Sequence, residues 1–175
     1  MPVDVARLTI VHHPASVLRR KAQPLPAGPA SAEVRAVARR MLELMHQAPG
    51  VGLAAPQVGL SWRLFVANHL GFDHPDADRV FINPVLADPS PDTDDREEGC
   101  LSIPGVHVTL RRPSRITITA QDLDGNPVTL TADDLQSRIW QHETDHLDGV
   151  LIIDRMTAMD RMANRRALQE LEAGR

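Results

Sequence analysis

Apolar residues recur at every third or fourth position in two long stretches of the chain, and this spacing predicts two amphipathic helices. The first begins after Ser31, a residue suited to cap a helix N-terminus, and ends before Pro49-Gly50. Its apolar stripe consists of Val34, Val37, Ala38, Met41, Leu44 and Met45. A further helix is predicted at the C-terminus from about residue 158, because Thr157 and Asp160 have the spacing of a capping box.

The second amphipathic stretch carries two histidines in its apolar stripe. Thr131 and Asp134 have capping-box spacing at its start, and Gly149 stands where a glycine commonly ends a helix. The stripe, at positions i, i+4, i+7 and i+11, is formed by Leu135, Ile139, His142 and His146. Both imidazoles are therefore expected to point toward the interior, where each needs a polar partner.

Shorter segments have the patterns of β-strands. Residues 106–110 and 116–120 alternate between apolar and polar positions, as half-buried strands do. Asp124-Gly125 predicts a hairpin turn into a strand at 128–130. Short apolar runs predict further strands, and these lie at 64–67, 80–86 and 150–153. The Pro/Asp-rich residues 87–97 are expected to be an exposed loop.

The order of these elements indicates an α+β fold. Strands are grouped between the helices rather than alternating with them, so the sheets are expected to be small and mixed or antiparallel. A chain of 175 residues is expected to form a single domain over residues 1–175, with 157–175 as its C-terminal helix.

Composition and charge argue against several functional classes. The net charge of −4 gives no general basic surface for nucleic acid, and three Phe, two Trp and no Tyr are few for base stacking. No apolar run approaches the ~20 residues that span a membrane, and the N-terminus lacks the pattern of a secretory signal. The lone Cys100 cannot form an internal disulfide, so a cytoplasmic location is expected.

The residues His142-Glu143-Thr144-Asp145-His146 form an H-E-x-x-H motif within the second helix. Histidines at i and i+4 lie on one helix face and are placed to bind one divalent metal ion, with Glu143 beside it as a proton carrier. The motif alone leaves a zinc protease and several other hydrolases open. A catalytic zinc site needs a third protein ligand.

Candidates for that third ligand stand on both sides of the motif. Downstream, the acidic candidates Asp154, Glu170 and Glu172 have no motif that supports them. Upstream, Cys100 follows Gly99, which permits a close backbone approach, and a thiolate is a good ligand for first-row metals. The alternative interpretation of Cys100 is a small core residue.

Three motifs together resemble those of the polypeptide deformylases. These motifs are Gly50-Val51-Gly52-Leu53-Ala54-Ala55-Pro56-Gln57, Glu98-Gly99-Cys100-Leu101-Ser102 and Gln141-His142-Glu143-Thr144-Asp145-His146-Leu147. Their order and spacing agree with the family, and the similarity runs from about Ile10 to Ile153. Jointly they are far more specific than the pentapeptide alone.

The resemblance implies an activity, a cofactor and partners. The family removes the formyl group from N-formylmethionine at the start of new proteins and releases formate. The H-E-x-x-H helix is expected to pack against small sheets and to carry one divalent metal ion, with Fe²⁺ as the native metal and Zn²⁺, Ni²⁺ or Co²⁺ also accommodated. Nascent formylmethionyl polypeptides are the expected partners, in the bacterial cytoplasm, with no membrane and no sequence-specific nucleic acid.

Carried over residue by residue, the resemblance also implies a site. Its metal ligands are Cys100, His142 and His146, and its catalytic groups are Glu143, the Gln57 amide and the Leu101 backbone N–H. An apolar pocket for the methionine side chain is expected from Val51, Leu135, Ile139 and the side of His142, and Gly52 is expected to let the Gln57 loop approach the substrate.

Several other residues have expected roles near this site. Glu98 is expected to orient the ligands from behind, and Asp145 to have a structural partner such as an arginine. His107 stands where some relatives carry an arginine near the substrate, and Arg96 where an apolar pocket residue can occur, so either is a candidate to alter specificity. The C-terminal helix is locally basic and is a candidate to bind the ribosome, through Arg161, Arg165 and Arg166.

Two other functions remain as alternatives at this point. A zinc-dependent peptidase shares the pentapeptide but leaves Cys100 and Gln57 unexplained. A structural metal module needs a closed set of four ligands, and the sequence offers no evident fourth.

Overall fold

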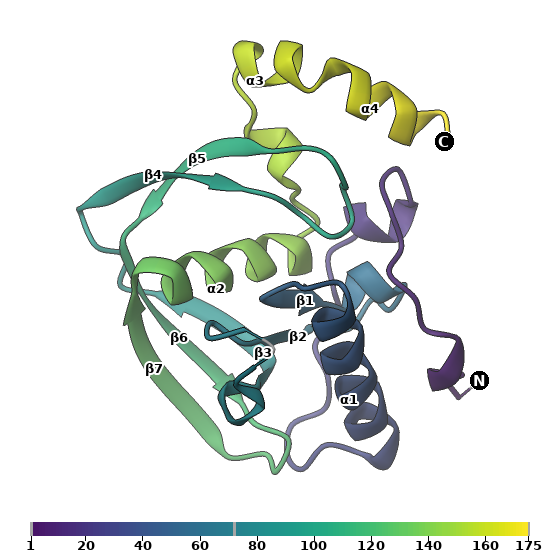
Figure 1. The fold of residues 1–175 in the computed structure, drawn as a ribbon. Helices are drawn as coiled ribbons and strands as arrows, with labels where there is room; N and C mark the ends of the chain where they lie inside the picture. Colours follow the sequence, from purple (N-terminus) through teal and green to yellow (C-terminus); the bar gives the residue numbers. More distant parts are fainter. Residues whose placement is uncertain (1, 72, 175) are drawn as a thin grey trace.

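A five-stranded antiparallel sheet curves around the helix that carries the H-E-x-x-H motif. The computed structural model describes residues 2–71 and 73–174. The sheet has the strand order β1-β2-β3-β6-β7, all neighbours being antiparallel. Its strands are β1 (Gly52–Ala54), β2 (Leu64–Ala67), β3 (Arg79–Ala87), β6 (Arg115–Gln121) and β7 (Pro127–Asp133). Figure 1 shows α2 (Asp134–Leu147) between this sheet and a second, two-stranded sheet.

The second sheet is the antiparallel pair β4 (Thr93–Glu98) and β5 (Val108–Pro113), which lies across α2 from the larger sheet (Figure 1). Their connection holds Cys100 and the loop 101–107. The α+β class with small antiparallel sheets and a central helix is therefore confirmed.

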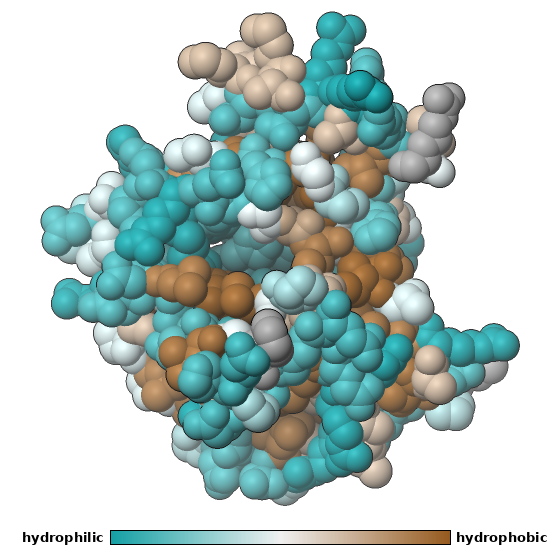
Figure 2. Space-filling model, viewed as in Figure 1, coloured by the Kyte–Doolittle hydropathy of each residue, from teal (hydrophilic) through white to brown (hydrophobic). Residues whose placement is uncertain are grey.

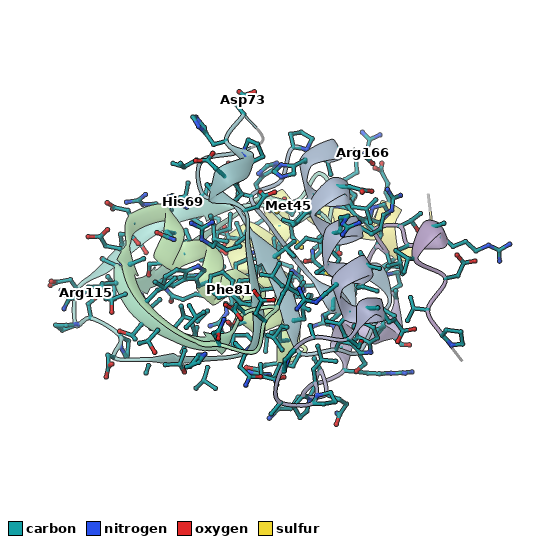
Figure 3. The ribbon with its side chains drawn as sticks, turned by 90° about the horizontal axis from the view of Figure 1, so that it is seen from below. Met45, His69, Asp73, Phe81, Arg115 and Arg166 are labelled. Carbon is teal, nitrogen blue, oxygen red and sulfur yellow. The ribbon has the colours of Figure 1, made fainter. Side chains whose placement is uncertain are left out.

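Helix α1 (Ala32–Gln47) covers the β1–β2 end of the large sheet. Ser31 caps it as predicted, since its Oγ accepts from Val34 N at 3.2 Å. The predicted apolar stripe is buried throughout, and Met45, labelled in Figure 3, packs in a core with Leu53 and Leu64 of β1 and β2. This packing fixes the strand that reaches the metal-binding helix.

Apolar contacts also hold α2 against the large sheet. The Phe81 ring of β3 (Figure 3) lies 5.8 Å from the Trp140 ring of α2, edge to face. Trp140 is 1% exposed and Leu147 is fully buried in the same core. Gly149, with φ of 76°, follows the helix as predicted, and any side chain there would collide with the Arg19 backbone. The orientation of α2 is thus set by packing along its length.

The start of α2 differs from the capping-box prediction. Thr131 belongs to β7, where its backbone pairs with Thr117 and its hydroxyl lies 2.9 Å from the Thr117 hydroxyl. The sheet pairing continues to Asp133, so the helix begins only at Asp134 and Thr131 cannot cap it. Strand pairing outweighs the local capping preference here.

Two other segments differ from the pattern-based predictions. Residues 93–97 of the expected exposed loop 87–97 belong to β4, which pairs with β5 from Thr93 to Glu98 and places Asp95 2.9 Å from Arg111 and Asp94 2.6 Å from Arg138 of α2. Ile152 and Ile153, expected in a strand at 150–153, begin a 3-10 helix that runs over Ile152–Arg155. Short apolar runs do not distinguish these two conformations.

The C-terminal segment begins as predicted but is divided. Thr157 and Asp160 form the expected capping box of α3 (Ala158–Ala163), and the chain then turns at Asn164 into α4 (Arg165–Glu172). Arg175 of the predicted helix lies outside the described residues. Among the described residues, no helix combines the length and the apolar character needed to cross a membrane.

Candidate metal centre

Helix α2 and the segment after β4 bring three metal-binding side chains together. Cys100, His142 and His146 each offer a ligand atom, and these atoms all lie within 4.8 Å of one another. The Cys100 Sγ is 3.2 Å from His146 Nε2, and the two imidazole rings are 5.0 Å apart. His142 and His146 follow Cys100 by 42 and 46 positions in the chain, yet the three side chains converge on one point.

The donor set fits a divalent metal ion. Ligands of a tetrahedral site with bonds of about 2.0–2.3 Å lie roughly 3.3–3.6 Å apart, and the 3.2 Å between Cys100 Sγ and His146 Nε2 is close to this value. His146 is 2% exposed and burial lowers its pKa well below the usual value, so its imidazole is neutral, as a metal ligand must be. A thiolate with two imidazoles suits first-row metals and leaves a fourth position for water or substrate.

Glu98 orients His142 through the imidazole nitrogen Nδ1. Its Oε2 is 3.0 Å from His142 Nδ1. An ionised carboxylate there accepts a hydrogen bond from Nδ1–H, which leaves Nε2 as the nitrogen available to a metal. Glu98 is also held by Arg112, through Nε at 2.6 Å and Nη2 at 2.9 Å, and by Arg138 at 2.7 Å. This geometry is consistent with the role expected for Glu98, which is to orient a metal-binding histidine from behind.

The charges in this network balance although the groups are buried. Glu98 and Arg112 side chains are each 5% exposed. Burial raises the pKa of Glu98, but hydrogen bonds from Arg112 and His142 outweigh it and hold the pKa well below its usual range. Asp145 forms ion pairs with Arg112 at 2.9 Å and with Arg155 at 2.7 Å, so two arginines fill the role of the structural partner expected for Asp145.

Glu143 lies beside the ligands, against β1. Its side chain is 4% exposed, and burial raises its pKa to about 7. Within the part of the chain that the structure describes, Glu143 Oε2 has no hydrogen-bond partner. The carboxyl group therefore has a free oxygen and exchanges a proton near neutral pH.

Gln57 is fixed with its amide nitrogen toward the metal ligands. Its Oε1 accepts from Ala54 N at 2.8 Å, while Nε2 lies 3.6 Å from Cys100 Sγ and 3.3 Å from Ser102 Oγ. The side chain is 1% exposed, so its orientation is set by these buried contacts. It presents N–H donors to the site.

One cavity of about 360 Å³ joins these groups. The predicted residues that line it are Val51, Gly52, Gln57, Cys100, Leu101, Leu135, Ile139, His142 and Glu143. His146 lies behind this surface, as its burial requires. Figure 2 shows a recess at the centre of this face, bordered by apolar side chains, below the β4–β5 sheet of Figure 1.

The remaining sequence candidates lie elsewhere or have other partners. Asp154 pairs with Arg19 at 2.5 Å, and Glu170 pairs with Arg166 at 2.8 Å. Arg96, considered as a specificity residue, pairs with Asp134 at 2.8 Å and does not line the cavity, whereas His107 does.

The sequence analysis missed two arginines and one loop. Arg112 continues the inward alternation of Val108 and Leu110 along β5, which is a signal that could have placed it inside. Arg138 lies one turn before His142 on α2, and the loop 103–107 forms one wall of the cavity. Of that loop the sequence analysis singled out only His107, and it expected residues 106–107 to belong to a strand that instead begins at Val108.

The fold and the site define a metal-dependent hydrolase, with an H-E-x-x-H helix and a cysteine next to its two histidines. The family model of polypeptide deformylases matches residues 7–162. Peptide deformylase 2 of Gloeobacter violaceus is 48% identical over 71% of this chain and 66% of its own. The peptide deformylase of Acidobacterium capsulatum is 39% identical over 93% of this chain and 94% of its own.

A solved structure agrees with these sequences. The peptide deformylase of Plasmodium falciparum is 37% identical, covers 93% of this chain and 94% of its own, and superposes with a TM-score of 0.88. The chain belongs to the polypeptide deformylase family. It is a metal-dependent hydrolase that removes the N-formyl group from newly made polypeptides.

Proposed function

We propose that Cys100, His142 and His146 are the protein ligands of the catalytic metal. Their convergence within 4.8 Å is the observation that carries this assignment. A metal ion held by these residues would supply a Lewis acid that acidifies water and polarises the formyl oxygen. Glu98 supports the set by holding His142 in one tautomer.

Glu143 is proposed as the proton carrier. Water adds to the formyl carbon and the C–N bond breaks, so one proton must leave the water and one must reach the departing amine. Glu143 lines the cavity with Cys100 and His142, and its Oε2 makes no hydrogen bond to another described residue, which supports both transfers by one group. Formate and a free methionine amine are the products.

Gln57 and Leu101 are proposed to stabilise charge on the formyl oxygen. The Gln57 amide nitrogen points toward Cys100, and Leu101 follows Cys100 on the cavity wall. N–H donors held where an oxyanion develops strengthen as its charge grows, so they act on the transition state more than on bound substrate.

The methionine side chain is proposed to lie against Val51, Leu135 and Ile139, with Gly52 in the floor beside it. These residues line the same cavity as Glu143. Val51 is 37% exposed and Leu135 is 44% exposed, so apolar surface is available at the cavity edge. An unbranched, polarizable side chain suits such a surface.

Formate release separates this function from the competing ones. The protein loaded with Fe²⁺ under anaerobic conditions is expected to release formate from formyl-Met-Ala-Ser and to leave internal peptide bonds intact. Internal cleavage without formate would favour a peptidase. Tight metal binding without either activity, and without exchange of a hydroxamate at the metal, would favour a structural site.

The native metal is proposed to be Fe²⁺, with Zn²⁺, Ni²⁺ and Co²⁺ accommodated. The ligand set accepts all of them, because thiolate and imidazole bind every member of the series. Metal analysis after anaerobic purification tests this, and a preparation that carries only zinc and is fully active would contradict it.

The ribosome is proposed as a partner in the cytoplasm, through the α3–α4 surface. Arg165 and Arg166 are exposed there beside Met159 and Met162, which are 76% and 73% exposed. Salt-sensitive co-sedimentation with ribosomes should fall for Arg165→Glu/Arg166→Glu. Point variants are needed because Leu168 of α4 belongs to the core, so deletion of the helix disturbs the fold. Unchanged co-sedimentation of the double variant would contradict docking.

A further inference from the structure

Asn164 at the junction of α3 and α4 clamps the backbone of His107. Its Oδ1 accepts from His107 N at 3.2 Å, and its Nδ2 donates to His107 O at 2.9 Å. The same Nδ2 also donates to Asp160 O at 2.9 Å, which fixes the amide to α3. Both backbone groups of one residue, 57 positions away, are therefore held by one side chain.

The C-terminal helix also packs behind the loop that contains His107. Leu168 is 7% exposed and lies in one core with Ile103 and Val106, which are almost fully buried. Figure 1 shows α3 and α4 next to the end of the β4–β5 sheet. Since a Cβ on Gly105 would lie 4.0 Å from Ala167 Cβ, the loop and α4 also approach each other at this point.

The front of this loop is a wall of the catalytic cavity. Its lining residues are Ile103, Gly105, Val106 and His107. The His107 ring lies near Gly99, whose Cβ would be 3.6 Å from His107 Nδ1, and that nitrogen is 3.4 Å from Glu97 Oε1. The position of His107 thus sets the shape of the cavity wall beside Gly99, the residue that precedes Cys100.

We infer that Asn164 is a positioning residue for substrate binding. It touches neither the cavity nor the metal ligands, and it acts by holding His107 and the 103–107 wall at the distance that fits a bound polypeptide. This inference rests on the deformylase activity given above and concerns substrate affinity rather than the chemical step. The C-terminal segment is therefore part of how the enzyme binds its substrate.

The test compares Asn164→Ala with Gln169→Ala in the metal-loaded, full-length enzyme. Gln169 is an exposed amide on α4 and serves as the matched control. Loss of two hydrogen bonds should raise KM for formyl-Met-Ala-Ser about 5- to 10-fold, with kcat within about twofold of wild type. Amide hydrogen exchange in residues 103–108 should accelerate about tenfold in Asn164→Ala only. Asn164→Ser, which also removes both bonds to His107 and places a residue suited to the N-cap of α4, carries the test with the same expected rise in KM if the alanine variant does not fold.

Equal KM values for wild type and Asn164→Ala would overturn the inference, whether or not exchange in the loop changes. A fall in kcat and in bound metal at constant KM would also overturn it, because the clamp would then serve the metal centre. Absence of formate release by the wild-type enzyme is a different result, and it would contradict the proposed function itself.

Discussion

A Cβ atom on Gly52 would lie 2.8 Å from Glu143 Cδ, so β1 and the carboxylate of α2 pass each other with no room for a side chain. The absence of a side chain at Gly52 is thus required by Glu143 as well as by any substrate approach. The carboxylate of Glu143 packs directly against the backbone of β1 at Gly52.

Gly52→Ala is expected to lower kcat by displacing Glu143. A shift of about 1 Å in a reacting group costs roughly 100-fold in rate, while the metal ligands are untouched. Steady-state formate release with metal analysis of the same sample checks this. A variant with full metal and unchanged kcat would show that Glu143 tolerates displacement.

Cys100→Ala should lose most bound metal and most activity, because two imidazoles remain where three ligands are needed. The measurement is metal content after dialysis against a weak chelator. His107→Ala is the matched control, since His107 lines the same cavity without belonging to the ligand group, and it should keep its metal. A full equivalent of tightly bound metal in Cys100→Ala would remove Cys100 from the ligand set.

Gln57→Leu should lower kcat about 100- to 1,000-fold with a much smaller change in KM, because its amide donors act on the developing oxyanion. The buried Ala54 N–H would lose its acceptor as well, so thermal unfolding must be measured in parallel. If a folded, metal-loaded Gln57→Leu enzyme turned over at the wild-type rate, Gln57 would have no part in the mechanism.

The Glu98 network predicts how stability depends on pH. The pKa of Glu98 is lower in the folded state than in the unfolded state, so its contribution is complete above the ordinary value of 4.5 and is lost as pH falls below it. Urea unfolding of metal-free protein should show this loss between about pH 5 and pH 3.

The control for that prediction is Glu98→Gln, which should be less stable throughout and should lose less stability on acidification. Its lower stability follows because the buried Arg112 and Arg138 would each lose one of their two carboxylate partners and keep only Asp145 and Asp94. An acid response identical to that of wild type would show that other carboxylates cause it.

The sequence predicted the parts of the fold that depend on local patterns. Helices α1 and α2 follow from apolar periodicity, and the antiparallel strands β5 and β6 follow from alternation. Strand β4 was missed because its side chains are charged, and the groups it pairs with, β5 and Arg138 of α2, lie later in the chain. Thr131 was misjudged because strand pairing outweighed its capping preference.

The site could be predicted to the same extent. The spacing of the H-E-x-x-H motif identified His142 and His146, and the resemblance to the family implied Cys100; the structure brings all three together. The groups behind them, Arg112 and Arg138, and the clamp from Asn164 are long-range contacts that no local pattern marks. Only the fold reveals them.

Formate release by metal-loaded Glu143→Gln tests the central claim most directly. The amide keeps the size of the side chain but cannot accept a proton, so the variant should bind metal and a hydroxamate inhibitor normally. Its turnover of formyl-Met-Ala-Ser should fall about 100-fold or more. Near-normal formate release from a Glu143→Gln protein with a full complement of metal would contradict the role of Glu143 as the proton carrier.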